Sequence, residues 1–308
     1  MRYEDAVAFR QALEDRLKAG TRNDPARLVR DRKRVAFDRL LARLVAVAPG
    51  RWLLKGGFAL DLRLGERARA TKDVDIEWRA NADQLIDALI EAANYDDAGD
   101  FFVFTIERAG TPRDRLGGSL RFRVQASLAG RPFETFLLDV GFRQGDELSA
   151  ETLVTAGLLG FAEIAPVEVE AVPVELQVAE KLHAYTRRYD GGRINTRAKD
   201  LVDLTLVAEL AVVEAAGLRQ AVEATFADRE AHLVPTELPL PPRQWAAQFH
   251  QLAEAVGVPG GLEAGHRLAA GLLDPVLSGE VTSGVWDPEH ASWVDADTMP
   301  VNVPTPIN

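Results

Sequence analysis

The stretches Lys55-Gly-Gly-Phe-Ala-Leu60 and Thr71-Lys-Asp-Val-Asp-Ile-Glu77 decide the fold that we expect for this chain. The first follows the apolar run Trp52-Leu-Leu and predicts a buried strand, a tight turn and the start of a helix. Gly56 and Gly57 allow the backbone at a helix N-terminus to come close to a phosphate group. A Gly-Gly pair is also typical of any tight turn. The second stretch is therefore needed to distinguish a phosphate-binding turn from an ordinary one.

Asp73 and Asp75 carry the chemistry of the second stretch. Charged and apolar residues alternate from Asp73 to Trp78, as in a half-buried strand, so both carboxylates point to one face about 6–7 Å apart. Two like charges this close repel unless a cation lies between them, and Mg²⁺ prefers hard oxygen ligands. Such ions can activate an attacking hydroxyl and neutralise a leaving pyrophosphate. Alone, an Asp-x-Asp pair is more often an ordinary surface feature.

A third carboxylate is expected from a neighbouring strand. Asp139 lies in Phe136-Leu-Leu-Asp-Val-Gly141, an apolar stretch typical of a central strand. Burial of an ionised carboxylate is costly without a partner, and a metal ion would supply one. The alternative is that Asp139 lies at a strand end and faces water.

A second group of polar residues lies in the helical half of the chain. Lys181 falls in Glu180-Lys-Leu-His-Ala184, and Asp203 ends Arg197-Ala-Lys-Asp-Leu-Val-Asp203, both with helical spacing. An ammonium group suits contacts with triphosphate oxygens, and Asp203 would then position Lys181. The alternative is a salt bridge between two neighbouring helices. His183 has apolar neighbours, so we expect it to pack rather than to react.

Composition and charge exclude several classes of protein. The chain has 308 residues, no Cys and a net charge of −11. The absence of Cys excludes disulfides, zinc–thiolate sites and cysteine nucleophiles. Residues 1–80 hold 19 Lys and Arg against 12 Asp and Glu, while the remainder holds 17 against 35. The arginines between residues 22 and 69 favour a basic surface that binds a polyanion, with a solvated helix face as the alternative.

Other nucleotide-binding and hydrolase signatures are missing. The chain has no Walker A loop, no Gly-x-Gly-x-x-Gly and no Gly-x-Ser-x-Gly sequence, which excludes P-loop, Rossmann and α/β-hydrolase sites. No apolar run approaches the roughly 20 residues that cross a bilayer, and the N-terminus does not read as a secretory signal. We therefore expect a cytoplasmic protein with no membrane partner.

Three parts are expected along the chain. We predict helices at residues 3–19, 25–48, 81–93, 173–189, 197–227, 242–256 and 262–274. We predict strands at residues 52–55, 73–78, 101–107, 119–128 and 133–142, the last three of which would form a meander. Residues 1–165 would form a mixed α/β domain, and residues 166–280 a helical domain. Residues 281–308 are expected to be disordered or extended, with Trp286 and Trp293 as anchors.

The order of these features is that of the polymerase-β-like nucleotidyltransferase fold: strand, Gly-Gly, helix, arginine-rich linker, then Thr-x-Asp-x-Asp. With the Lys181 and Asp203 stretches added, the chain resembles the AbiEii/AbiGii toxin family of nucleotidyltransferases, over roughly residues 50–210. The resemblance implies an α+β fold, in which a nucleotidyltransferase core with a small mixed sheet precedes a mostly helical domain that contributes Lys181 and Asp203 to the active site.

The resemblance also implies residue roles. Asp73 and Asp75 match the metal-binding pair of the family, while Gly56 and Gly57 match the nucleotide-binding turn. Lys181 and Asp203 match the functional Lys and Asp of the later motifs. Lys55 and Thr71, together with Lys181, are assigned to nucleotide binding. Asp139 has no secure match, so its metal role rests on the physical argument alone, and Phe58 stands where the family often has a small residue.

A toxin of a toxin–antitoxin pair, with a cognate antitoxin as partner, follows from the same resemblance. Some members use a nucleoside triphosphate and Mg²⁺ to add nucleotides to the 3′ end of tRNA, so RNA is the acceptor that we expect. A second hypothesis is transfer to a small molecule such as an aminoglycoside, or to a protein hydroxyl, which the acidic remainder of the chain would suit. A third is a nucleotide-binding module without activity, against which the intact set of polar residues speaks.

Overall fold

A computed structural model describes residues 1–21, 24–96, 99–110, 119–142, 149–187, 197–229, 232–258 and 260–298. Its contacts divide the chain into two compact units. The first comprises Met1–Gly65 and Ala70–Val172, and the second comprises Glu66–Arg69 and Pro173–Asn308. The division into three parts at residues 165 and 280 stays a prediction. Arg22, one of the arginines counted in the basic excess, lies outside the described residues, as does the end of the tail.

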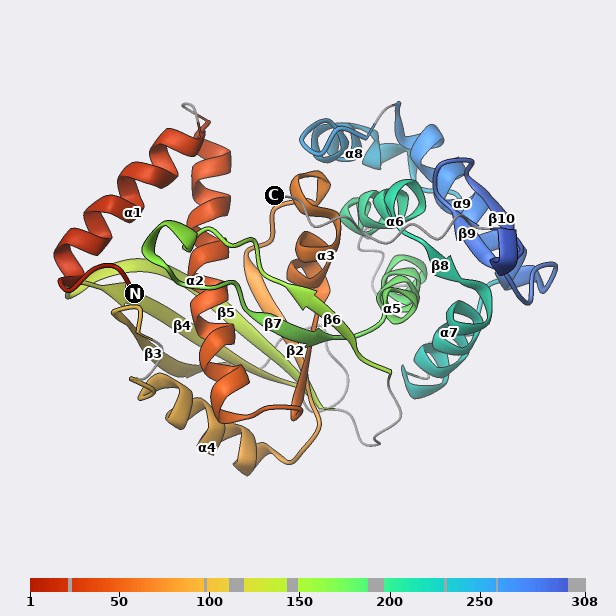
Figure 1. Ribbon diagram of the computed structural model, residues 1–308. Coiled ribbons are helices and arrows are strands. Elements are labelled where there is room, and N and C mark those ends of the chain that lie inside the picture. The colour runs from red at the N-terminus through yellow and green to blue at the C-terminus, as the bar shows by residue number, and fades with distance from the viewer. Residues whose placement is uncertain are drawn as a thin grey trace. The chain divides into compact units, whose positions relative to one another are not determined.

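The first unit is a mixed seven-stranded sheet with helices (Figure 1). Its strands, in the order β3-β4-β5-β2-β1-β7-β6 across the sheet, are β1 (Trp52–Lys55), β2 (Asp73–Trp78), β3 (Phe102–Ala109), β4 (Leu120–Leu128), β5 (Arg131–Phe142), β6 (Glu151–Val154) and β7 (Glu168–Ala171). Its helices are α1 (Ala6–Thr21), α2 (Pro25–Val47), α3 (Gly56–Leu64) and α4 (Ala82–Ala93). The α+β fold class is confirmed.

The predicted meander and central acidic strand are confirmed as well. β3, β4 and β5 are antiparallel neighbours, and β2 lies parallel to β5. The sequence patterns did not predict β6 and β7, because each has only four residues and neither is an apolar run like that of β1. Asp139 lies inside β5, in the middle of the sheet, so the alternative of a strand end is wrong.

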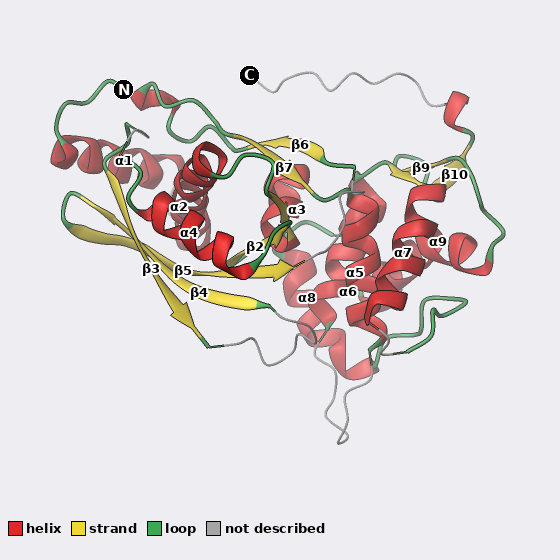
Figure 2. Cartoon of the chain, turned by 90° about the horizontal axis from the view of Figure 1, so that it is seen from below, coloured by secondary structure: helices red, strands yellow, loops and turns green. Residues whose placement is uncertain are grey.

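One face of the sheet forms the core of the first unit. The alternation in β2 places Val74, Ile76 and Trp78 fully inside this core. Helices α1, α2 and α4 lie over this face (Figure 2). Phe37 of α2 packs edge-on against Phe58, with ring centroids 4.9 Å apart. Phe58 is therefore a core residue, and its large side chain after the Gly-Gly turn faces the interior of the first unit.

Several arginines of the basic N-terminal region are buried in ion pairs. Arg34, Arg39 and Arg43 are only 6%, 3% and 2% exposed. Arg34 lies 2.7 Å from Asp61, and Arg43 lies 2.8 Å from Asp100. Buried charges of this kind must be paired, because desolvation of a lone ion costs several kcal/mol. For these three arginines both earlier interpretations, a basic surface and a solvated helix face, are wrong.

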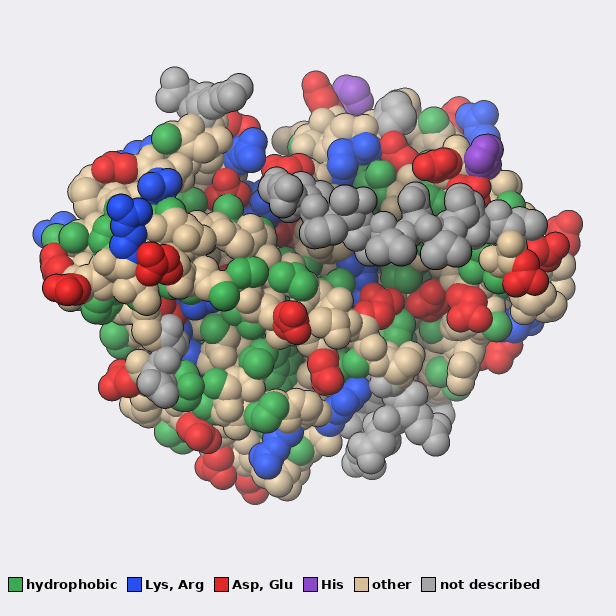
Figure 3. All heavy atoms as spheres, viewed as in Figure 1, with side chains coloured by type: hydrophobic (Ala, Val, Ile, Leu, Met, Phe, Trp, Pro, Cys, Tyr) green, Lys and Arg blue, Asp and Glu red, His purple; other side chains and the backbone are tan. Residues whose placement is uncertain are grey.

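The charged side chains on one face of the molecule are mixed in sign. On the face drawn in Figure 3, blue Lys and Arg side chains are interspersed with red Asp and Glu side chains. The described residues of this view show no continuous basic patch. Because Arg34, Arg39 and Arg43 are buried in ion pairs, the charge excess of residues 1–80 overstates the charge available to a polyanion.

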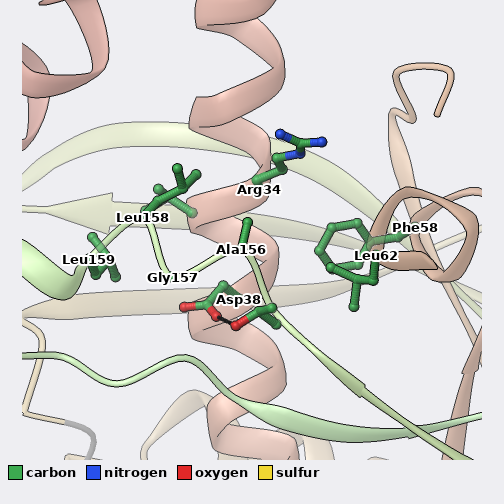
Figure 4. A pocket seen from close by; sticks show the side chains of 10 residues that line it. Arg34, Asp38, Phe58, Leu62, Ala156, Gly157, Leu158 and Leu159 are labelled. Atoms are coloured by element: carbon green, nitrogen blue, oxygen red, sulfur yellow. Dashed lines mark hydrogen bonds between the residues drawn. The ribbon is translucent and has the colours of Figure 1, made fainter. Parts of the chain in front are cut away.

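A small cavity lies beside α2, next to Asp38 (Figure 4). Thr155 donates a hydrogen bond to the Asp38 carboxylate, and burial raises the pKa of Asp38. The cavity has a volume of about 10 Å³, which is room for one water molecule at most. It is a packing defect and not a substrate site.

The second unit is mostly helical, as the sequence patterns predict. Its helices are α5 (Val174–Thr186), α6 (Ala198–Leu210), α7 (Ala215–Arg229), α8 (Ala246–Glu254) and α9 (Leu262–Ser278), and its strands are β8 (Val213–Glu214), β9 (Val285–Asp287) and β10 (Ser292–Val294). The single helical stretch expected at residues 197–227 is in fact two helices, interrupted by β8.

Strands β9 and β10 correct the expectation of a disordered or merely extended tail for residues 285–294. They form an antiparallel hairpin, which β8 extends to three strands. Trp286 is 1% exposed and donates a hydrogen bond to the carbonyl of Ala208 at 2.7 Å. Its ring lies 5.7 Å from that of Trp293. The two tryptophans are the predicted anchors, and their burial explains why so short a hairpin is stable.

No described helix combines the length and the apolar character that crossing a membrane requires.

Candidate active site

The turn after β1 packs directly against the acidic strand. Gly56 starts α3 with φ of +68°, a left-handed conformation that disfavours any residue with a Cβ. A Cβ added to Gly56 would also lie 2.7 Å from the Cγ of Asp75. At Gly57 an added Cβ would lie 2.7 Å from the Oγ1 of Thr71. The structure thus brings both glycines, Thr71 and Asp75 together.

This packing predicts a large cost for Gly56→Ala. Gly50→Ala is the matched control, since Gly50 has the same φ of +68° and no atom within 4 Å of an added Cβ. Both variants incur the left-handed strain, but only Gly56→Ala overlaps Asp75. We expect Gly56→Ala to unfold with about 1–3 kcal/mol less free energy than Gly50→Ala in a urea titration. Equal losses would contradict the close approach of the turn to Asp75.

Asp73 and Asp75 of β2 lie on the same face of the sheet as Asp139 of β5. In the parallel register Asp75 lies opposite Asp139, and Asp73 lies opposite Leu137. Burial raises the pKa of Asp73, and the negative charges of Asp75 and Asp139 raise it further. Burial and like charges both disfavour the ionised form of a carboxylate. The three carboxylates therefore make a site with excess negative charge, as the sequence predicted for their positions.

Arg121 of β4 is a site residue that the sequence analysis missed. It lies directly opposite Asp139 in the antiparallel register, and its guanidinium donates to both carboxylate oxygens, at 2.6 and 2.7 Å. This bidentate bond raises the pKa of Arg121. Asp139 is 5% exposed, so the partner that its burial demands is an arginine here. The alternation Leu120-Arg-Phe-Arg123 is the signal that places Arg121 on the acidic face.

Lys55 has a similar internal partner. Its ammonium group pairs with the carboxylate of Glu77, which lies on the same face of β2 two residues after Asp75. Both side chains are buried, and an added Cβ at Gly141 would lie 3.2 Å from the Lys55 Nζ. Lys55 therefore balances a buried charge in the sheet. Its role in nucleotide binding stays a prediction.

Asp73 and Asp75 are the residues that fit a metal ion. Within the described residues, no three His, Cys, Asp or Glu side chains are arranged to hold one, and Arg121 engages both oxygens of Asp139. Mg²⁺, however, usually binds one or two protein carboxylates and completes its shell with waters and substrate phosphates. The two carboxylates on β2 and the excess negative charge around Asp73 match that mode. The three-carboxylate site with Asp139 stays a prediction.

A larger cavity opens beside Asp73. It has a volume of about 530 Å³, within the range of small-molecule sites. Its lining comes from α2, from the segment before β2 and from β4 and β5: Ala26, Val29, Arg30, Lys33, Ala70, Thr71, Lys72, Asp73, Arg123, Thr135, Phe136 and Leu137. Four of these side chains are cationic and one is acidic. The cavity thus combines a candidate metal ligand with a positively charged wall.

Lys181 and Asp203 form a buried ion pair in the second unit. The Lys181 Nζ lies 2.5 Å from the Asp203 Oδ2, and Arg69 lies 3.3 Å from the same oxygen. Burial alone would lower the pKa of Lys181, but the carboxylates of Asp203 and Asp200 raise it. Burial alone would likewise raise the pKa of Asp203, but Lys181 and Arg69 lower it. The inter-helix salt bridge is confirmed, and a role in transfer stays a prediction.

His183 and Tyr185, on the same helix as Lys181, have packing and hydrogen-bonding partners. His183 is buried, with its ring 5.0 Å from that of Phe226. Burial and the nearby Arg229 lower the pKa of His183 to about 4. The hydroxyl of Tyr185 donates to the carbonyl of Pro239 at 2.6 Å. The prediction that His183 packs rather than reacts agrees with these contacts.

Comparisons with known proteins point to one family. The model of the nucleotidyl transferase AbiEii toxin of type IV toxin–antitoxin systems matches residues 39–263. The fold is similar to that of MenT4, a nucleotidyltransferase toxin from Mycobacterium tuberculosis, with a TM-score of 0.51, 18% identity, and coverage of 83% of this chain and 93% of that chain. JHP933 from Helicobacter pylori aligns with a TM-score of 0.44 and 15% identity over 80% and 93%. No curated protein matches by sequence.

Proposed function

Because this chain belongs to the AbiEii family of nucleotidyltransferase toxins of type IV toxin–antitoxin systems, we propose that it transfers nucleotides to RNA. The donor is a nucleoside triphosphate, the acceptor is the 3′ end of a tRNA, and Mg²⁺ assists. Membership of the family implies a transferase and a cognate antitoxin. The observation that carries the acceptor is the cavity beside Asp73, with its four cationic side chains.

The reaction replaces one phosphorus–oxygen bond by another. The 3′ hydroxyl of the acceptor gives up its proton to solvent and its oxygen bonds to the α-phosphorus. The bond between the α-phosphorus and the bridging oxygen breaks, and pyrophosphate leaves with that oxygen. Asp73 and Asp75 would hold Mg²⁺, which when bound neutralises charge on the triphosphate and activates the attacking hydroxyl. Gly56 and Gly57 carry no side chains at the start of α3, and the backbone N–H groups of a helix N-terminus are suited to phosphate oxygens.

Thr71, Lys181, Asp203 and Arg121 would also contribute to the reaction by binding or positioning other groups. Thr71 lines the cavity and packs against Gly57, so it connects the turn to the acceptor side. Lys181, positioned by Asp203, supplies a cation for triphosphate oxygens. Arg121 holds the Asp139 carboxylate in one orientation, because its guanidinium donates a hydrogen bond to each carboxylate oxygen.

An RNA acceptor fits the cavity better than a cationic small molecule. An aminoglycoside would meet the exposed cations Lys72 and Arg123 in the wall, and like charges repel it. A polyanion is attracted by the same wall.

Labelling of RNA tests the proposal. Purified protein is incubated with Mg²⁺, total tRNA and each of the four α-labelled nucleoside triphosphates. We expect label on tRNA with at least one of them, and loss of label when a chelator removes divalent ions. Periodate-oxidised tRNA, which has no 3′ hydroxyl, is the matched control and should stay unlabelled. Label on an aminoglycoside or a protein but not on RNA would refute the RNA acceptor.

A further inference from the structure

The cavity beside Asp73 has a defined place in the sheet. Strands β4, β5, β2 and β1 are consecutive neighbours in the sheet, so β2 with its two carboxylates lies between β1 and β5. The Gly56 turn follows β1 on one side of β2. The cavity residues of β4 and β5, Arg123 and Leu137 among them, lie on the other side.

This order separates the two substrates. In phosphoryl transfer the attacking and leaving oxygens are roughly in line on opposite sides of the phosphorus. If the triphosphate lies against Gly56 and Gly57, on the β1 side, the acceptor oxygen must arrive from the β5 side. That is the side on which the cavity opens.

The cavity is shaped by a mismatch in strand length. β5 begins at Arg131, but its pairing with β2 begins only at Leu137, opposite Asp73. The preceding part of β5 has no neighbour on that side within its described pairings. Helix α2 borders the gap, and Lys33 of α2 lies 3.1 Å from Glu134. A groove therefore leads along β5 to Asp73.

Two cations of the groove stand out. Arg30 is bound to Asp61 at 2.5 Å and Lys33 to Glu134, so both are partly neutralised. Lys72 and Arg123 are exposed, and neither has an ion-pair partner among the residues that the structure describes. Exposed cations that line a groove are suited to phosphate contacts. Val29, 53% exposed at the rim, offers an apolar surface to a base.

From these observations we propose that the groove along β5 binds the sugar–phosphate backbone of the acceptor RNA near its 3′ end, with Lys72 and Arg123 contacting phosphates. This inference rests on the proposed function, because it assigns the acceptor side of the same site. It assigns a role to Lys72 and Arg123, two residues to which the sequence analysis gave none.

Binding of RNA without reaction tests the groove. The full chain is titrated with a 5′-fluorescein single-stranded RNA dodecamer, without triphosphate or Mg²⁺, at salt concentrations from about 50 to 200 mM. The variant is Lys72→Ala with Arg123→Ala. Each lost phosphate contact on a single strand reduces the salt slope by about 0.7, so we expect a reduction of about 1.4. We also expect the Kd at about 100 mM salt to rise about tenfold.

Lys18→Ala with Arg108→Ala is the matched control, since both residues are exposed cations of the first unit outside the cavity. It should leave the slope and the Kd nearly unchanged. Melting temperatures of both double variants should equal that of the wild type, because exposed substitutions change stability by less than about 0.5 kcal/mol. An unchanged salt slope in Lys72→Ala with Arg123→Ala, or an equal loss of RNA affinity in the control, would overturn the proposal that the groove binds RNA.

Kinetics separate this inference from the proposed function. The variant of Lys72 and Arg123 should raise the KM for RNA while the KM for the triphosphate stays within about twofold. Wild-type protein that binds the dodecamer through these residues but labels no RNA would refute the transfer and leave the groove standing. Wild-type protein that labels tRNA with equal KM in both double variants would refute the groove and leave the transfer standing.

Discussion

Asp73→Asn and Asp75→Asn are each expected to lower nucleotide transfer about a thousandfold. Removal of one carboxylate weakens the hold on Mg²⁺, whose charge stabilisation of the transition state is worth several kcal/mol, and about 4 kcal/mol corresponds to that factor. The measurement is the initial rate of label transfer to tRNA at saturating triphosphate. Asp87→Asn, at an exposed position of α4 in the same unit, is the control and should keep the wild-type rate.

The same substitution at Asp73 should not weaken the fold. The pKa of Asp73 is raised by burial and by the charges of Asp75 and Asp139, so its ionised form is unfavourable in the folded chain. Asparagine has nearly the same shape without the charge. We expect a melting temperature equal to or above that of the wild type, together with loss of activity. A large drop in melting temperature would mean that activity was lost through unfolding, and full activity in Asp73→Asn would refute the catalytic assignment.

Asp203→Asn is expected to remove about 3–5 kcal/mol from the free energy of unfolding. The substitution leaves the buried cations Lys181 and Arg69 with one fewer counter-charge, and uncompensated buried charge is strongly destabilising. Urea unfolding measures the loss. Glu223→Gln is the control: Glu223 pairs with Arg219 at 3.9 Å but is 66% exposed, so its loss should cost less than about 1 kcal/mol.

The pH dependence of stability follows from the same pair. The pKa of Asp203 lies below its ordinary value of 3.8, so its contribution is present above that value and is lost as the pH falls below it. The pKa of Lys181 lies above its ordinary value of 10.5, so its contribution is present below that value and is lost as the pH rises through the higher folded value. Asp203→Asn should flatten the acid limb of the stability profile. An acid limb as steep as that of the wild type would contradict the assignment.

Local patterns were sufficient for the central part of the fold. The apolar run before Gly56, the helical spacing after it and the alternation from Asp73 to Trp78 each lie within a few residues. Such periods report directly which face of a helix or strand is buried. They therefore predicted β1, α3 and β2, and placed Asp73 and Asp75 on one face. The Gly-Gly turn was predictable for the same reason, although its contact with Asp75 was not.

Partners across the fold were beyond these patterns. Arg121 meets Asp139 because β4 and β5 pair in one register, and a shift of one residue would turn Arg121 to the opposite face. The sequence pattern suggests that the arginines of α2 are surface charges, but the packed fold pairs them with Asp61 and Asp100. The members of these pairs lie 18 to 61 residues apart in the chain. Local sequence patterns therefore do not predict which of them meet.

The sequence by itself determined the strand, turn, helix and acidic strand around Gly56 and Asp73, and through them the family of the chain. Tertiary structure alone decided how the charges are partnered. Asp139, Lys55 and Lys181 each pair with an opposite charge inside their own unit, whereas Lys72 and Arg123 stay exposed beside Asp73. The reason is physical, since periodicity is a property of neighbouring residues. The neutralisation of a buried charge depends on whichever distant side chain the packed fold brings within hydrogen-bonding distance.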